Sequence, residues 1–191
     1  MGKKPVAAGS SSINLVDTDR LFKILNLKKG MSIIDLACGW GYYSFEMSKY
    51  AGDDGHVYAV DLWREGISFI EEQIAERRIK NITPILADVS RNIPLEDECV
   101  DLCLMATVLH DLIEDHTDQG TLKEVRRVMK KEGVLALIEF KVMDGPPGPP
   151  KKIRISPEDA EEILLPYGFS TESSIDLGDF VYLSVFRKAG L

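Results

Sequence analysis

The sequence predicts an α/β protein with three layers, doubly wound around a mostly parallel seven-stranded sheet that closes with a C-terminal antiparallel hairpin. Between Ser32 and Phe140, short apolar segments of strand type alternate with segments of helical type, which is typical of β-α units. The segment Val134–Ile138 is apolar throughout, as expected for a parallel strand buried on both faces. Near the C-terminus two strand-type segments are joined by Gly178-Asp179, and so short a connection allows only an antiparallel hairpin.

Length and composition indicate a single cytoplasmic domain. A chain of 191 residues with 45% apolar residues can bury a substantial core. No run of about 18 apolar residues occurs, so no membrane span is expected. The net charge of −8 opposes sequence-independent nucleic-acid binding. The N-terminus lacks the apolar core of a signal peptide, and three cysteines without C-x-x-C spacing indicate a reducing compartment.

The N-terminal segment is expected to differ from the rest of the chain. Residues 1–16 are rich in Gly, Ala and Ser and predict a mobile tail, or a flap over a bound ligand, ahead of a core at 17–191. Asp17 is a candidate helix cap. The apolar positions of that first helix, expected to pack on the sheet, are Leu21, Ile24 and Leu25, with Phe22 beside them.

The remaining elements follow from apolar periodicity and turn residues. Strands are expected at 33–35, 57–61, 82–87, 100–106 and 134–140, followed by the hairpin strands 170–177 and 181–187. Helices are expected at 42–50, 64–78, 121–129 and 157–165. The helix at 64–78 is predicted to bury Ile67, Phe69, Ile70 and Ile74. Ser156-Pro157 is a capped helix start with proline in the first turn.

The segment from Ser32 to Ser44 predicts a ligand-binding turn between a strand and a helix. The strand ends in Asp35, and a small-residue turn follows, made of Ala37, Cys38, Gly39 and Gly41. A dinucleotide fingerprint would place a third glycine where Ser44 stands. A carboxylate beside the loop would repel a pyrophosphate, whereas it suits a ligand that carries an ammonium group. Cys38 is expected to be a small packing residue of this turn.

Further acids follow the ends of the next two strands, where open α/β sheets bind ligands. Asp61 lies 20 residues beyond Gly41, a spacing that fits a carboxylate accepting hydrogen bonds from ribose hydroxyls. Asp88 follows the third strand and fits a carboxylate that accepts from an adenine amino group. The predicted apolar walls and floor of this pocket are Leu62, Val89 and Ala106.

This order of motifs resembles the class I S-adenosylmethionine-dependent methyltransferases, and is most similar to the branch that includes the ubiquinone/menaquinone-biosynthesis enzymes. The resemblance implies a Rossmann-like methyltransferase fold, S-adenosylmethionine as cofactor and S-adenosylhomocysteine as product. It also implies that Ala37 and Gly39 contact the methionine end through backbone atoms, and that Asp35 helps to hold the amino group. The sequence departs from many members at Ala37, where they have glycine. The implied activity is methyl transfer to a small molecule by in-line displacement, achieved mainly by positioning and exclusion of water.

Catalytic groups are less evident from the sequence. His110 is the candidate acid or base, because it lies just beyond the fourth strand and titrates near neutral pH. The alternative, which we favour, is that His110 begins a helix and packs without proton transfer. Glu139 and Lys141 are expected at the rim as substrate contacts or a solvated pair, and no metal site is expected.

Two other functions remain open at this level. An NAD-dependent oxidoreductase would use Asp61 equally well, although Asp35 and Ser44 oppose it. A non-catalytic module of this fold could bind a partner through Pro146-x-x-Pro149. The sequence does not distinguish oxygen, nitrogen, carbon, sulfur and arsenic nucleophiles as methyl acceptors. The site is expected to close over a small substrate either through the N-terminal flap or through a second subunit in a homodimer.

Overall fold

Strands and helices alternate along most of the chain in the computed structural model, which describes Gly9 and residues 11–189. The strands are β1 (Ser32–Leu36), β2 (His56–Asp61), β3 (Ile82–Leu86), β4 (Val100–Ala106), β5 (Met129–Phe140), β6 (Phe169–Asp176) and β7 (Val181–Lys188). The α-helices are α1 (Thr18–Ile24), α2 (Tyr42–Ala51), α3 (Arg64–Arg77), α4 (Leu109–Glu114), α5 (Asp118–Val128) and α6 (Pro157–Leu164). Short 3-10 turns are η1 (Ile13–Leu15), η2 (Lys151–Ile153) and η3 (Leu165–Tyr167).

The strands form one seven-stranded sheet in the order β3-β2-β1-β4-β5-β7-β6. Strands β1 to β5 are parallel, whereas β7 runs antiparallel to both β5 and β6. The predicted fold class, including the C-terminal hairpin, is confirmed. The order of strands reverses between β1 and β4, and Leu36 of β1 lies beside Val60 on one side and Met105 on the other. Open sheets of this kind bind ligands beyond the carboxyl ends of the strands at such a reversal.

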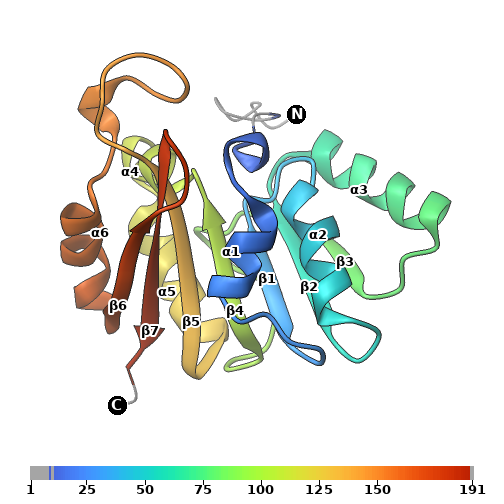
Figure 1. Ribbon diagram of the computed structural model, residues 1–191. Helices are drawn as coiled ribbons and strands as arrows, with labels where there is room; N and C mark the ends of the chain where they lie inside the picture. The colour runs from blue at the N-terminus through green and yellow to red at the C-terminus, as the bar shows by residue number, and fades with distance from the viewer. Residues whose placement is uncertain (1–8, 10, 190–191) are drawn as a thin grey trace.

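Helices cover both faces of the sheet, as Figure 1 shows. Helices α1, α2 and α3 pack on one face around Ile33 and Leu102. Helices α4, α5 and α6 pack on the other, around Ile34 and Cys103. The two sets of strand residues are neighbours in sequence because successive side chains of a strand point to opposite faces. The loop from β5 to α6 rises above the strand ends at the top of Figure 1.

Helix α1 begins where expected but buries a different face. The Asp17 side chain accepts a hydrogen bond from the Arg20 amide at 3.0 Å, which confirms the cap. Ile24, predicted to pack on the sheet, is 36% exposed, and Phe22 is buried in its place. At 100° per residue, Leu21, Phe22 and Leu25 share an arc of the helix that excludes Ile24. The sequence pattern alone did not distinguish these two arcs.

Helix α3 buries two of its four predicted positions fully. Ile67 and Ile70 are buried, whereas Phe69 and Ile74 are only partly buried at the edge of the same core. Phe69 points sideways, and its ring lies 5.1 Å from the Trp40 ring in an edge-on contact. The helix therefore packs on the sheet through a narrow stripe and on the β1–α2 loop through its flank.

The C-terminal elements agree with the sequence apart from the length of β5. That strand begins at Met129 rather than Val134, and its pairing with β4 shifts register between Val100 and Leu102. Helix α6 has a capping box, in which the side chains of Ser156 and Asp159 each bond the other's backbone amide.

Part of the predicted N-terminal flap lies outside the described residues, namely 1–8 and 10. In the described part, Ser12 is buried and its hydroxyl lies 3.1 Å from the Tyr43 hydroxyl. A flap function for residues 1–16 stays a prediction. Among the helices formed by the described residues, none has the length and apolar character needed to cross a membrane.

Candidate functional site

A cavity of about 390 Å³ lies at the carboxyl ends of the central parallel strands. Its walls come from the loop after β1, the end of β2, the loop after β3, the end of β4 and helix α4. Seven of the ten predicted cofactor-binding residues line it, namely Ala37, Gly39, Asp61, Leu62, Asp88, Val89 and Ala106. Asp35, Cys38 and Gly41 do not line it.

The loop after β1 depends on left-handed backbone conformations. Ala37, Gly39 and Gly41 have φ angles of 57°, 56° and 73°. Alanine tolerates this region at a small cost, whereas glycine adopts it freely. A Cβ atom on Gly41 would lie 2.7 Å from Cγ1 of Ile70. Gly41 is therefore a packing residue at the start of α2 rather than a cavity wall.

Asp61 holds this loop in place. Its two carboxylate oxygens accept hydrogen bonds from the backbone amides of Gly39 at 2.8 Å and Trp63 at 2.7 Å. Burial raises the pKa of Asp61, and the backbone donors oppose that rise. Each oxygen has a second acceptor position, so the carboxylate can also receive hydroxyl groups of a ligand in the cavity.

Asp35 lies behind the loop instead of in the cavity. Its side chain is 2% exposed, and the Ser44 hydroxyl donates to Oδ2 at 2.5 Å. Burial raises the pKa of Asp35 to about 7, partly opposed by the Ser44 bond and reinforced by the charge of Asp61. Ser44, which stands where a dinucleotide fingerprint has glycine, thus serves as the donor for this acid. That Asp35 helps to hold an amino group, directly or through a water, stays a prediction.

The third predicted acid, Asp88, is exposed at the cavity mouth. Its Oδ1 accepts from the backbone amide of Ser90 at 3.0 Å and from the Ser90 hydroxyl at 2.6 Å. Arg91 forms an ion pair with Oδ2 at 3.2 Å. Leu62, 48% exposed, and the buried Val89 line the cavity with Asp88 and supply apolar surface to it.

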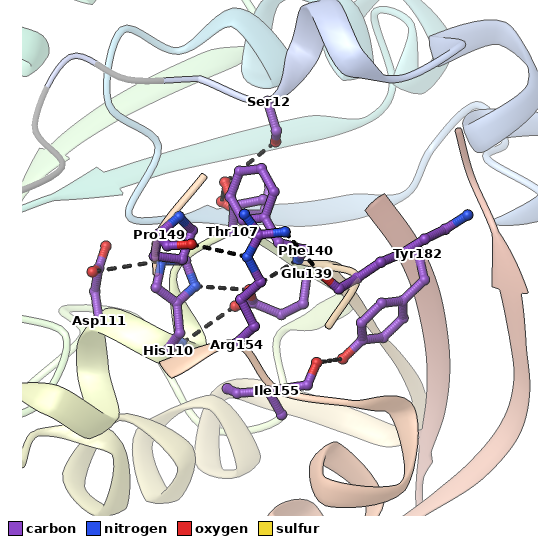
Figure 2. A network of polar contacts seen from close by, with 12 residues as sticks. Ser12, Thr107, His110, Asp111, Glu139, Phe140, Pro149, Arg154, Ile155 and Tyr182 are labelled. Atoms are coloured by element: carbon purple, nitrogen blue, oxygen red, sulfur yellow. Dashed lines mark hydrogen bonds and ion pairs between the residues drawn. The ribbon is translucent and has the colours of Figure 1, made fainter. Parts of the chain in front are cut away.

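His110 is buried and does not line the cavity. Its Nδ1 lies 2.7 Å from Oε2 of Glu139, which is completely buried and not at the rim as expected (Figure 2). Lys141 pairs with Asp176 at 3.0 Å. Asp111, the residue after His110, lines the cavity in its place.

The cavity has a strongly acidic lining. Five of its lining residues are acids, namely Asp61, Asp88, Asp111, Glu114 and Asp115. Within the described part of the chain, none of the lining residues is Lys, Arg or His. Asp111, Glu114 and Asp115 come from α4 and its C-cap, and their i, i+3, i+4 spacing places them on one helix face. The sequence indicates Leu109–Thr117 only as a segment for substrate recognition, without cavity roles for Glu114 and Asp115. The negative charge of this lining disfavours binding of a pyrophosphate and favours binding of a positively charged ligand.

No group of three or more His, Cys, Asp or Glu side chains placed to hold a metal ion occurs among residues 9 and 11–189. The fold and the site define a Rossmann-like α/β protein with an acidic cavity at the switch point of its sheet. A family model described as "Methyltransferase domain" matches residues 27–165. The chain belongs to this methyltransferase family, which confirms the resemblance seen in the sequence.

Individual relatives agree with this assignment. The chain is 33% identical over 120 residues to the ubiquinone/menaquinone biosynthesis C-methyltransferase UbiE of Paraburkholderia phytofirmans, a match covering 62% of this chain and 47% of the relative. It is 27% identical over 117 residues to a demethylmenaquinone methyltransferase of Geobacillus, covering 61% and 48%. The crystal structure of a SAM-dependent methyltransferase from Aquifex aeolicus is similar with a TM-score of 0.85 and 29% identity over 93% of each chain. The chain spans about half the length of the curated relatives it matches.

Proposed function

We propose that this chain binds S-adenosylmethionine in the 390 Å³ cavity and catalyses methyl transfer to a small-molecule acceptor, with S-adenosylhomocysteine as the second product. The observation that carries the proposal is the convergence of the β1–α2 loop, Asp61 and Asp88 on one cavity without a basic side chain among its described lining residues. When bound, the cofactor supplies a sulfonium-activated methyl group. The residues of this chain supply binding, orientation and exclusion of water.

The donor set fits that cofactor. Asp61 retains acceptor positions for the two ribose hydroxyls, and Asp88 lies where it can accept from the adenine amino group. Leu62 and Val89 offer apolar surface to the purine ring. The backbone of Ala37 and Gly39 borders the methionine end, and Ala106 lies at the floor. In this arrangement Asp35 and Cys38 do not contact the cofactor, and they contribute by stabilising the conformation of the β1–α2 loop.

The two alternative functions receive less support from the site. A pyrophosphate-bearing nicotinamide cofactor would meet five carboxylates in the cavity. A polyproline ligand motif needs an accessible backbone, but the carbonyls of Pro147 and Pro149 accept hydrogen bonds from Arg154 at 2.8 Å and 2.9 Å. Since two similar enzymes are a ubiquinone/menaquinone biosynthesis C-methyltransferase and a demethylmenaquinone methyltransferase, quinone precursors are the first acceptors to test. A cytoplasmic location and a homodimer remain parts of the proposal, and sedimentation analysis tests the latter.

Calorimetric titration with S-adenosylmethionine, S-adenosylhomocysteine and NAD tests the cofactor. Both sulfur ligands are expected to bind, and Asp61→Ala is expected to weaken them about 10- to 100-fold, because a hydrogen bond to a charged group contributes about 1.5–3 kcal/mol. Asp53→Ala, in the exposed turn after α2, is the matched control and should bind normally. Asp61 also accepts a hydrogen bond from the Gly39 amide, so Asp61→Ala both removes a charge and frees the loop. Asp61→Asn removes the charge but keeps an acceptor oxygen, and comparing the two variants separates these effects. Binding of NAD with no response to either sulfur ligand would overturn the proposal.

A further inference from the structure

A groove of about 540 Å³ lies at the amino ends of the central strands, at the opposite edge of the sheet from the cofactor cavity. Its walls come from the α1–β1 connection, the start of β4, the start of β5 and the hairpin strands β6 and β7. In Figure 1 the α1–β1 connection and the starts of β4 and β5 lie at the bottom of the sheet. Among the described residues, none lines both the groove and the cofactor cavity, so the two are separate sites.

The groove is basic, although the chain is acidic. Five of its described lining residues are basic, namely Lys28, Lys29, Lys130, Lys131 and Arg187. Three are acidic, namely Asp101, Glu132 and Glu172. The whole chain has the opposite balance, with 23 basic and 31 acidic residues. Two Lys-Lys pairs that are far apart in sequence thus meet in one groove, because each lies at the amino end of a parallel strand of the same sheet.

Two of the five basic side chains are neutralised by acids of the groove. The Lys130 ammonium pairs with Asp101 at 2.8 Å, and the Arg187 guanidinium pairs with Glu172 at 2.7 Å. The other three lysines, namely Lys28, Lys29 and Lys131, are exposed and form no ion pair within the described part of the chain. The groove therefore keeps an excess of positive charge on a concave surface, which attracts an anion.

The β5 wall of the groove is an irregular part of the sheet. Residues 130–133 of β5 have only Asp101 of β4 opposite them, because the pairing of the two strands shifts register there. Asp101 holds this bulge in place, since its carboxylate accepts hydrogen bonds from the Ser32 backbone amide and the Lys130 ammonium, both at 2.8 Å. Bulges redirect side chains and are common beside functional sites. This one interrupts the strand at the position where Lys131 lines the groove.

The groove also has an aliphatic surface. Ile24, which the packing of α1 leaves outside the core, is exposed in the groove, and Met31 and Val134 are half-buried beside it. Ligand sites commonly combine apolar surface with a few charged groups that fix the orientation of the ligand. Cationic and aliphatic side chains on one concave surface therefore suit a ligand that joins a negatively charged head to an apolar part.

We propose that this groove is a second binding site, whose ligand is a small amphiphilic organic anion. The phosphate or carboxylate head of the ligand contacts Lys28, Lys29 and Lys131, and its aliphatic part covers Ile24 and Val134. The acidic lining of the cofactor cavity repels the same anion, so the two sites select ligands of opposite charge. The second site goes beyond the proposed methyltransferase function and does not depend on it.

NMR of the ¹⁵N-labelled full chain, titrated with monomeric octyl phosphate below its micelle concentration, tests the site. We expect saturable shifts of the backbone amides at 28–31 and 130–134, with a Kd of about 1 mM, from the usual binding free energy per non-hydrogen atom of a small ligand. Octyltrimethylammonium, which has the same chain and the opposite charge, should not shift these amides. Inorganic phosphate should bind about 10-fold more weakly, since burial of two methylene groups accounts for that factor.

Substitutions at exposed positions assign the binding to the groove. Lys28→Glu and Lys131→Glu should each weaken octyl phosphate binding about 10-fold or more, the scale for loss of a hydrogen bond to a charged group. Lys80→Glu, which is exposed outside the groove, makes the same change of net charge and should leave the affinity unchanged. Ile24→Ser should remove the advantage of octyl phosphate over inorganic phosphate, with the exposed Leu165→Ser as control. S-adenosylhomocysteine affinity should be the same in all five variants, which keeps this test separate from that of the proposed function.

Three results would overturn the second site. The first is an octyl phosphate titration without saturable shifts in the groove. The second is equal weakening by Lys80→Glu, which would mean a general attraction of the anion to surface lysines. The third comes from co-sedimentation with phosphatidylglycerol vesicles. Vesicle binding that depends on Lys28 and Lys131, without binding of monomeric octyl phosphate, would identify a membrane-surface contact in place of a small-ligand site.

Discussion

The buried carboxyl of Asp35 provides a quantitative test of how the β1–α2 loop is built. Its pKa of about 7 in the folded protein compares with an ordinary value of 3.8. Roughly 3 pH units at about 1.36 kcal/mol each amount to about 4 kcal/mol. The group is fully buried, so solvent screening does not reduce this figure.

The direction of the pH dependence follows from the number of protons bound by the folded and the unfolded chain. Between pH 3.8 and about 7 the folded chain holds the Asp35 proton and the unfolded chain does not, so the free energy of unfolding falls as pH rises. The stabilisation from protonated Asp35 is complete below the pKa of the unfolded chain and is lost as pH rises through the pKa of the folded chain. Asn imitates the protonated acid and can accept the Ser44 hydroxyl. Asp35→Asn should therefore match the wild type near pH 4 and exceed its unfolding free energy by about 4 kcal/mol near pH 8.

Urea unfolding at several pH values between 4 and 8 measures this difference. Subtracting the unfolding free energy of the wild type from that of Asp35→Asn cancels the titration of all other carboxyls. The control Asp53→Asn, in an exposed turn, should show no pH-dependent difference from the wild type. Ser44→Ala removes the bond that lowers the pKa of Asp35, so it should move the upper end of the transition to higher pH. A constant difference between Asp35→Asn and wild type would refute the argument, since it would mean that Asp35 is ionised throughout.

Two further substitutions test the walls of the site. In Gly66→Ala the new Cβ would lie 2.4 Å from the Gly39 carbonyl oxygen, so we expect about 1–3 kcal/mol lower stability by urea unfolding and weaker S-adenosylhomocysteine binding, with Glu71→Ala as control. In Arg154→Lys a single ammonium cannot serve four carbonyls, so we expect a loss of about 1–3 kcal/mol and faster proteolysis at 141–153. Unchanged stability in either variant would contradict the contacts described.

The part of the cavity formed by the β1–α2 loop, Asp61 and Asp88 was predictable, because it depends on sequence patterns within single β-α units. Strand ends follow from apolar runs, and the carboxyl ends of parallel strands meet at one edge of a sheet, so Asp61 and Asp88 could be placed beside the glycine loop. The same rule misplaced Asp35. Strand β1 continues to Leu36, and alternation along the strand turns Asp35 away from the faces of its neighbours, towards Ser44 of α2.

The arrangement around α4 and the β5–α6 loop was not predictable in the same way. Glu139 lies near the end of an apolar strand and was expected at the rim, because no residue close to it in the sequence indicates a partner. Its partner His110 lies 29 residues away, and only the β4–β5 pairing brings the two together. Arg154 is similar, since a basic residue after a Pro-rich loop usually faces solvent. In the fold its guanidinium is surrounded by the carbonyls of that loop.

The two halves of the cavity therefore place different demands on the chain. A sulfonium donor is already activated, so its half needs shape and hydrogen-bond acceptors, which a backbone loop and two strand-end carboxylates can provide. A proton, when the acceptor must lose one, needs side chains with matched pKa values and a route to water. Helix α4 and the end of β5 bring Asp111 and Glu139 to 3.5 Å and 2.7 Å from the imidazole nitrogens of His110. Most of the proposed cofactor-binding residues thus come from the β1 to β3 edge of the sheet, whereas Asp111, His110 and Glu139 come from α4 and β5.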